Sequence, residues 1–234
     1  WVAHWQKGPL IGKANYYYPL NLENKAVTYQ KFQYFDDTHV AWLDLLKLLD
    51  RLRDDQQIQG VAINMAGMRC RTSLLWEFRQ KINEIKASGK EVVVHLDRAG
   101  SGLYYLAASA DRITMDPYGG VDLPGTALSR SYLKGTLEKL GIGFQEHRYL
   151  KYKSAVETLS RDHMSDGDRE QRQRIADVIY ETIREGVTQG RNLTNDQYDG
   201  IVDNLVQLVA TDALDNGLID EISRWDKMSK WLKT

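Results

Sequence analysis

Three short apolar runs, which alternate with helical patterns, constrain the fold of this chain more than any other feature. The runs are Gly60–Met65, Glu91–Leu96 and Arg112–Met115. Each is bounded by turn residues, which is typical of a strand buried on both faces. Amphipathic stretches alternate with the runs, over residues 38–54, 73–88 and 101–110. Strands and helices in this order form βαβ units, so the sequence predicts an α/β fold with a mostly parallel sheet.

The second half of the chain is mostly helical in pattern. Residues 130–140 predict a helix and residues 142–149 a further strand. Helical spacing then dominates, over residues 154–160, 166–189, 195–209 and 211–216. We therefore expect repeated βαβ units followed by a helical C-terminal region.

The start of the chain differs from the rest. Residues 14–18 and 26–34 are aromatic and β-leaning, which indicates an extended arm or an edge hairpin. We expect residues 1–40 to form an N-terminal arm or edge segment and residues 41–222 to form one α/β domain. A helical tail, 223–234, would complete the chain. Because the first residue is Trp1, we also expect a piece of a longer protein or a mature form.

Charge and composition exclude several functions. The 31 Lys and Arg residues are balanced by 32 Asp and Glu, so the chain lacks the basic surface that nucleic-acid binding requires. A single cysteine, Cys70, excludes an internal disulfide framework and a Cys-based metal cluster. The five histidines show no metal-ligand spacing. We expect no metal, no cofactor and no nucleic-acid partner. The apolar runs are also too short to span a bilayer.

Ser101 is the first candidate for chemistry. It lies between Gly100 and Gly102, just past a predicted strand and at the start of a predicted helix. Ligands collect at this edge of an open α/β sheet, and the positive end of a helix favours a developing negative charge. The alternative interpretation is an ordinary N-cap serine.

Lys153 is the second candidate. It precedes Ser154 and Glu157, whose spacing fits a capping box, so it would lie just before a helix. The charged form of a buried lysine at the positive end of a helix is disfavoured, and the neutral amine can act as general base towards a serine hydroxyl. The alternative is a solvated basic cluster with Arg148 and Lys151.

The third candidate is the turn that follows the first strand, Asn64–Met68. A glycine there, Gly67, lets backbone N–H groups approach a substrate oxygen, as an oxyanion hole requires. An ordinary strand-to-helix turn is the alternative. We expect His95, inside an apolar strand, to be a core residue, and Cys70 to serve packing rather than chemistry.

Several segments, in this order and spacing, resemble one family. They lie at residues 48–61, 101–113, 137–142, 152–157, 164–170 and 213–220, and the resemblance runs from about Leu45 to Asp220. The family is signal peptide peptidase A, a group of membrane-associated serine proteases. The resemblance implies the Clp protease/crotonase-like fold and a Ser-Lys dyad, with Ser101 as nucleophile and Lys153 as general base. It also implies that the N–H groups near Gly67, Met68 and Gly102 form the oxyanion hole.

The sequence departs from the family pattern at two points. Only Gly67 remains of the family's glycine pair, and Leu103 replaces a preferred glycine. In these departures the sequence resembles the amino-terminal half of a tandem member of the family. In tandem members the amino-terminal half supplies the lysine and the carboxyl-terminal half supplies the serine. Ser101 instead fits single-domain members, in which neighbouring subunits complete each other's sites.

The resemblance implies a serine endopeptidase that degrades cleaved signal peptides or similar hydrophobic peptides. The peptide would bind as an added strand, and the protein would work as a homo-oligomer or with a second peptidase domain. It would be membrane-associated in the bacterial cell envelope, facing the periplasm or the extracytoplasmic side, with the anchor outside this chain. One alternative is a catalytically inactive scaffold or peptide-binding member. Another is a crotonase-type acyl-CoA enzyme, for which residues 60–72 lack the required acid.

Overall fold

The computed structural model describes residues 16–30 and 36–231, which fall into two compact units. Unit 1 contains the described residues up to Pro124 and those from Ile183 onwards, and unit 2 contains residues 125–182. The candidate serine and glycines belong to unit 1, whereas Lys153 belongs to unit 2. The expected boundaries at residues 40 and 222 stay predictions.

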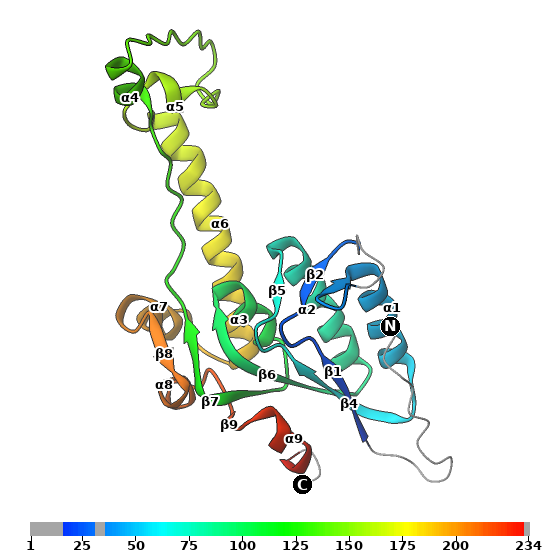
Figure 1. Ribbon diagram of the computed structural model, residues 1–234. Helices are drawn as coiled ribbons and strands as arrows, with labels where there is room; N and C mark the ends of the chain where they lie inside the picture. Colours follow the sequence, from blue (N-terminus) through cyan, green and yellow to red (C-terminus); the bar gives the residue numbers. More distant parts are fainter. Residues whose placement is uncertain (1–15, 31–35, 232–234) are drawn as a thin grey trace. The chain divides into compact units, whose positions relative to one another are not determined.

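A six-stranded sheet forms the centre of unit 1 (Figure 1). Its order is β1-β4-β6-β7-β8, with β9 pairing β7 as well. Every pairing is parallel except that of β7 with β8. The strands are β1 (Tyr16–Asn21), β4 (Ile58–Asn64), β6 (Glu91–Gly100), β7 (Arg112–Asp122), β8 (Gln207–Val209) and β9 (Glu221–Ile222). The predicted α/β architecture with a mostly parallel sheet is confirmed.

The remaining elements of unit 1 are a small sheet and a set of helices. The small sheet has the order β3-β2-β5 and is parallel throughout. Its strands are β2 (Ala26–Thr28), β3 (His39–Ala41) and β5 (Arg69–Cys70). The helices are α1 (Trp42–Asp54), α2 (Thr72–Ala87), α3 (Ser101–Ala107), α7 (Asn195–Asn204), α8 (Ala210–Asp215) and α9 (Trp225–Trp231), with the end of α6 (Asp166–Arg191).

Apolar periodicity explains where these elements lie. The valines Val92–Val94 of β6 are fully buried, as expected for a parallel strand covered on both faces. Helix α1 buries one side, formed by Trp42, Leu45, Leu49 and Leu52. The ring of Trp42 lies 5.6 Å from that of Phe78 in α2, and its indole N–H donates to Glu77 at 2.6 Å. These contacts pack α1 against α2 in the core of unit 1.

Three predicted helices of unit 1 are shorter than expected, and the one predicted over residues 101–110 ends at Ala107. The first begins at Trp42 because residues 39–41 form β3, and the helix predicted over 195–209 ends at Asn204. Val206 adopts a φ of +41°, which takes the chain out of the helical conformation. Residues 207–209 then pair antiparallel with the end of β7. Tertiary pairing therefore overrides the helical pattern there.

Unit 2 contains α4 (Lys134–Lys139), α5 (Glu157–Ser160) and the first part of α6. The strand predicted over residues 142–149 is wrong, because this segment is irregular. A strand requires a neighbour, and unit 2, which the structure describes completely, contains none. The polar side chains of the segment form ion pairs instead: Glu146 with Arg161, and Arg148 with Glu157.

The interior of unit 2 is polar. Its buried residues are Glu157, Ser165, Gly167 and Asp168, so no apolar side chain of residues 125–182 is buried. Large apolar side chains are instead exposed, namely Leu133, Leu140, Ile142, Phe144, Tyr149, Leu150, Tyr152, Val156, Ile175 and Val178. Ion pairs and hydrogen bonds, rather than an apolar core, therefore hold unit 2 together.

Candidate active site

Ser101 is the first residue of α3 and follows β6 directly. The N-cap is Gly100, and no side chain caps the helix, so the N-cap interpretation of Ser101 is wrong. Within the described part of the chain, no group forms a hydrogen bond with the half-buried Ser101 hydroxyl. Gly102 is the second residue of α3, where the helix itself provides no acceptor for the N–H group.

The turn that contains Gly67 and Met68 lies between β4 and β5. Gly67 has a φ of +62°, and a Cβ there would collide with the Asn24 amide oxygen, so both the conformation and the space require glycine. Its N–H donates to Asp97 Oδ1 at 2.9 Å. The N–H of Met68 donates to the Met65 carbonyl oxygen at 3.0 Å. Two of the three predicted oxyanion donors therefore have acceptors within this chain.

Asp97 is a site residue that the sequence reasoning missed. The pairing of β6 with β7 changes register between Leu96 and Arg98, and such an irregularity redirects a side chain. Asp97 Oδ1 accepts the N–H of Arg98 at 2.6 Å as well as that of Gly67. The sequence around Gly67 contains no acid, since residues 60–72 lack both Asp and Glu. Because β4 and β6 are parallel neighbours, a residue at the end of β6 reaches the turn after β4.

Lys153 lies in a turn of unit 2, and α5 begins only at Glu157. The predicted capping box is wrong, because the Ser154 hydroxyl donates to Asp168 at 2.8 Å instead of capping α5. Glu157 is fully buried and binds Arg148 and Ser165. Its spacing from Ser154 mimics a cap, but the carboxylate is an internal partner of other side chains.

The neighbours of Lys153 are all bound to α6. The ammonium of Lys151 contacts Glu170 at 2.6 Å, and the hydroxyl of Tyr152 donates to the same carboxylate at 3.0 Å. The Tyr152 carbonyl oxygen accepts from the Gln171 amide at 3.1 Å. The Lys153 side chain is exposed, and within the described residues it has no hydrogen-bond or ion-pair partner. The interpretation as a solvated basic cluster is therefore wrong for Arg148, which is largely buried against Glu157, whereas Lys151 and Lys153 are exposed.

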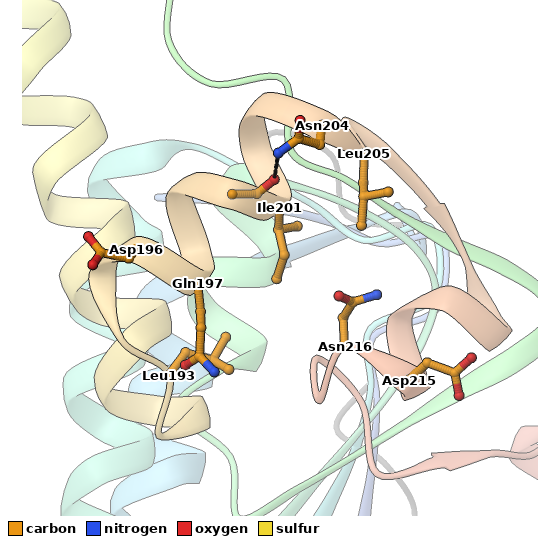
Figure 2. Close-up of a pocket in the computed structure, with 9 residues that line it drawn as sticks. Leu193, Asp196, Gln197, Ile201, Asn204, Leu205, Asp215 and Asn216 are labelled. Carbon is orange, nitrogen blue, oxygen red and sulfur yellow. Dashed lines mark hydrogen bonds between the residues drawn. The ribbon is translucent and has the colours of Figure 1, made fainter.

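Unit 1 and unit 2 each contain a hollow in the part of the chain that the structure describes. One, of about 460 Å³, lies beside the Lys153 segment and is lined by Tyr152, Glu170, Gln171, Arg174 and Ile175. The other, of about 450 Å³, lies between α7 and the end of α8 in unit 1 and contains no candidate site residue. Figure 2 shows Asn204 on its rim, with the side-chain amide donating to the Gly200 carbonyl. Only the first hollow adjoins a candidate for chemistry.

The remaining ionisable candidates are structural. His95 is buried with Nδ1 3.0 Å from Thr114 Oγ1, and burial lowers the pKa of its imidazole. It is a core residue, as predicted. Burial raises the pKa of the Cys70 thiol to about 11, which disfavours the nucleophilic thiolate. No group of His, Cys, Asp and Glu residues in the described chain could hold a metal, and no described helix is long and apolar enough to cross a membrane.

Comparison with known proteins identifies relatives. The family model for peptidase family S49 matches residues 84–234. Protease 4 of Salmonella typhi is 30% identical over 188 residues, covering 77% of this chain and 30% of its own length. Protease 4 of Haemophilus influenzae is 28% identical over 172 residues, with coverages of 73% and 28%. The chloroplastic serine protease SPPA of Arabidopsis thaliana is 29% identical over 179 residues, with coverages of 76% and 26%.

The chain thus spans less than a third of the length of these three relatives. The matched region of the family model contains β6, the serine at the start of α3, and the whole of unit 2 with Lys153. Family S49 has the Clp protease/crotonase-like fold, in agreement with the parallel sheet and repeated βαβ units described above. The family model covers well over half of the sequence, and the chain therefore belongs to peptidase family S49, the signal peptide peptidase A family.

Proposed function

We propose that this chain is part of a serine endopeptidase with a Ser-Lys dyad, in which Lys153 is the general base. One observation carries the proposal: the ammonium of Lys153 is exposed and unpaired among the described residues, while Lys151, Tyr152 and Ser154 around it are all bound to α6. A base must reach the serine of a substrate complex, and it works best from a fixed backbone. The segment meets both requirements.

The chemistry follows from the residue types. The neutral amine of Lys153 accepts the proton of a serine hydroxyl as the serine oxygen attacks the peptide carbonyl carbon. The resulting ammonium then donates its proton to the leaving amine as the C–N bond breaks. Water then hydrolyses the acyl-enzyme. The amine of Lys153 accepts a proton from the attacking water and returns it to the serine oxygen as the ester bond breaks. A partner domain or a bound peptide that covers Lys153 would exclude water and favour the neutral amine.

The nucleophile in this proposal comes from a second peptidase domain or subunit. Asp97 supports this choice, because its carboxylate accepts the Gly67 N–H that an oxyanion of Ser101 would require. A carboxylate beside that N–H repels a developing negative charge. Ser101 as the nucleophile of this chain is the competing assignment, supported by its unpaired hydroxyl at a helix start.

An inactive scaffold or peptide-binding member is the second candidate function. The oxyanion turn favours it, since the Gly67 and Met68 N–H groups both have acceptors in the chain. This candidate assigns no chemistry to Lys153. It differs from the first in predicting that no serine of the whole protein depends on Lys153.

The substrates we propose are cleaved signal peptides or similar hydrophobic peptides. The hollow beside Lys153 supports an apolar ligand, because Tyr152 and Ile175 on its rim are 49% and 52% exposed. The exposed apolar side chains of unit 2 support assembly, either as a homo-oligomer or with a second peptidase domain. We further propose membrane association in the bacterial cell envelope, facing the periplasm or the extracytoplasmic side, because the resemblance to the signal peptide peptidase A family implies it and both relatives named Protease 4 are bacterial.

Labelling with a fluorophosphonate tests the dyad, because the reagent reacts only with an activated serine. The full-length protein would be compared with its Lys153→Ala, Ser101→Ala and Lys151→Ala variants. Lys151→Ala is a matched control, since it removes a lysine two residues away that already has an acidic partner. We expect labelling to be lost in Lys153→Ala and retained in Lys151→Ala and Ser101→Ala.

The other outcomes are distinct. Loss of labelling in Ser101→Ala would assign the nucleophile to this chain and contradict the partner-serine assignment. Labelling retained in Lys153→Ala would refute Lys153 as the base. An absence of labelling in every form of the full-length protein would favour the scaffold. Native mass spectrometry of the same samples would report the assembly.

A further inference from the structure

The backbone beside Lys153 is held by a buried carboxylate, Asp168. This side chain belongs to the first turn of α6 and is 3% exposed. One of its oxygens accepts the Ser154 hydroxyl at 2.8 Å, and the other accepts Arg130 at 3.1 Å and Arg172 at 3.0 Å. Ser154 follows Lys153 directly in the sequence. A single residue therefore connects the candidate base to a buried charged group.

The contacts of Asp168 continue further into unit 2. The N–H of Asp168 donates to the Ser165 hydroxyl at 3.2 Å, and that hydroxyl donates to Glu157. Glu157 is fully buried and also binds Arg148. The network thus joins the Lys153 segment, the start of α5 and the start of α6.

The protonation of both carboxylates favours a fixed geometry. Burial raises the pKa of each, but the hydrogen bonds outweigh it: those from Ser154, Arg172 and Arg130 hold the pKa of Asp168 below its usual value. Hydrogen bonds from Ser165 and Arg148 do the same for Glu157. Both groups are therefore charged at neutral pH. Charge-assisted hydrogen bonds are short and directional, so they fix the groups that they join.

The side of the segment opposite Ser154 is equally constrained. A Cβ built on Gly167, the neighbour of Asp168, would lie 2.4 Å from the Lys151 carbonyl oxygen. Backbone therefore lies directly against backbone at this point. The segment is held by Asp168 on one side of Lys153 and by Gly167 on the other, while the Lys153 side chain is exposed.

We propose that Asp168 is a positioning residue for Lys153. Through the hydroxyl of Ser154, Asp168 fixes the point at which the lysine side chain leaves the backbone. The proposal rests on the proposed role of Lys153 as general base. A base displaced by about 1 Å loses much of its effect, since proton transfer requires hydrogen-bond distance. The polar interior of unit 2 then has a catalytic purpose in addition to a structural one.

The test uses four variants of the full-length protein. Ser154→Ala removes the link alone, and Ser154→Thr retains a hydroxyl as a conservative rescue. Asp168→Asn removes the buried charge, and Asp166→Asn removes an exposed carboxylate from the same helical turn as its matched control. Amide hydrogen exchange over residues 150–155 and the rate of fluorophosphonate labelling are both measured, with Lys153→Ala alongside.

We expect exchange over residues 150–155 to rise about tenfold in Ser154→Ala and Asp168→Asn. Labelling should fall by a similar factor in Ser154→Ala. Ser154→Thr should restore both values, and Asp166→Asn should change neither. A global loss of stability would instead raise exchange throughout unit 2, and not only over residues 150–155.

Two outcomes separate this proposal from the proposed function. Unchanged exchange in Ser154→Ala, or labelling as slow in Ser154→Thr as in Ser154→Ala, would overturn the positioning role even if Lys153→Ala is inactive. Raised exchange together with full labelling of Lys153→Ala would instead refute Lys153 as the base, and with it the catalytic meaning of its positioning.

Discussion

Replacing Gly167 with alanine perturbs the candidate base without touching it. Gly167 lies in the first turn of α6, and its Cα faces the backbone of the Lys151 segment. The added methyl group would lie 2.4 Å from the Lys151 carbonyl oxygen and 3.2 Å from the carbonyl carbon. Because the neighbour is backbone and not the end of a flexible side chain, a rotamer change cannot relieve the clash.

The size of the effect follows from these distances. An ordinary carbon contact starts near 3.4 Å, so the helix and the segment must separate by about 1 Å. A displacement of about 1 Å in a catalytic group can lower the rate about 100-fold. Helix propensity acts in the opposite direction, but by less than the roughly 1 kcal/mol that alanine gains over glycine in a helix interior, because Gly167 lies in the first turn. We therefore expect a folded protein whose serine labelling is about 100-fold slower.

The assay is the rate of fluorophosphonate labelling in the full-length protein, with thermal unfolding measured on the same samples. Gly135→Ala is the matched control, because Gly135 lies in α4 of the same unit and a Cβ there meets nothing within 4 Å. It should label as the wild type does. If Gly167→Ala labels as fast as Gly135→Ala while both are folded, the close approach does not position the base and the reasoning is wrong.

Three further predictions concern buried ionisable groups. Glu157→Gln removes the charge of the fully buried partner of Arg148, which keeps Glu146 alone, and should lower the free energy of unfolding by about 3 kcal/mol. Glu170→Gln, in an exposed pair, should leave the urea unfolding curve close to that of the wild type. The hydrogen-bonded carboxylates of Asp168 and Glu157 have lowered pKa values in the folded chain. The stability that they contribute is therefore present above about pH 4.3 and is lost as the pH falls through the pKa values of the folded state. The midpoint of urea unfolding should drop on acidification, and it should drop less in Glu157→Gln. Burial raises the pKa of Cys70 to about 11, so its alkylation at pH 8 should be about 100-fold slower than that of a model thiol. The alkylation rate should keep rising with pH until the pH reaches about 11. Rapid alkylation of the folded protein at pH 8 would contradict this prediction.

The central sheet could be predicted because its signal is local. The valines of β6 and the apolar side of α1 are read directly from spacing, and the structure buries them as expected. The short strand β8 could not be predicted in this way, because its three residues continue the helical pattern of α7. Its conformation depends on pairing with β7, which is distant in the sequence.

The polar interior of unit 2 has no local signature. Glu157 follows Ser154 at the spacing of a capping box, and the segment 142–149 begins with Ile142 and Phe144 at the spacing of one face of a strand. The structure that these segments adopt depends instead on where Arg148, Ser165 and Asp168 lie in space. A charged residue in a sequence is expected to be exposed, so a core built of ion pairs is read as surface.

One part of the candidate site could be predicted from the sequence, and another part could not. Ser101 could be placed at a helix start from its glycine neighbours, and the structure has it there. Asp97 could not be predicted from the sequence beside Gly67, because the contact joins the ends of two parallel strands that are distant in the sequence. The ends of neighbouring parallel strands are the positions to search for such partners.

The exposed apolar side chains of unit 2 have a practical consequence for anyone who prepares this chain alone. Leu140, Ile142, Phe144 and Tyr149 follow one another closely in the sequence, and no described residue of the unit covers them. Apolar surface of this kind drives association at the concentrations of purification and storage. Co-expression with a second peptidase domain of the family, or surface substitutions such as Phe144→Ser, should therefore keep more of the chain in solution.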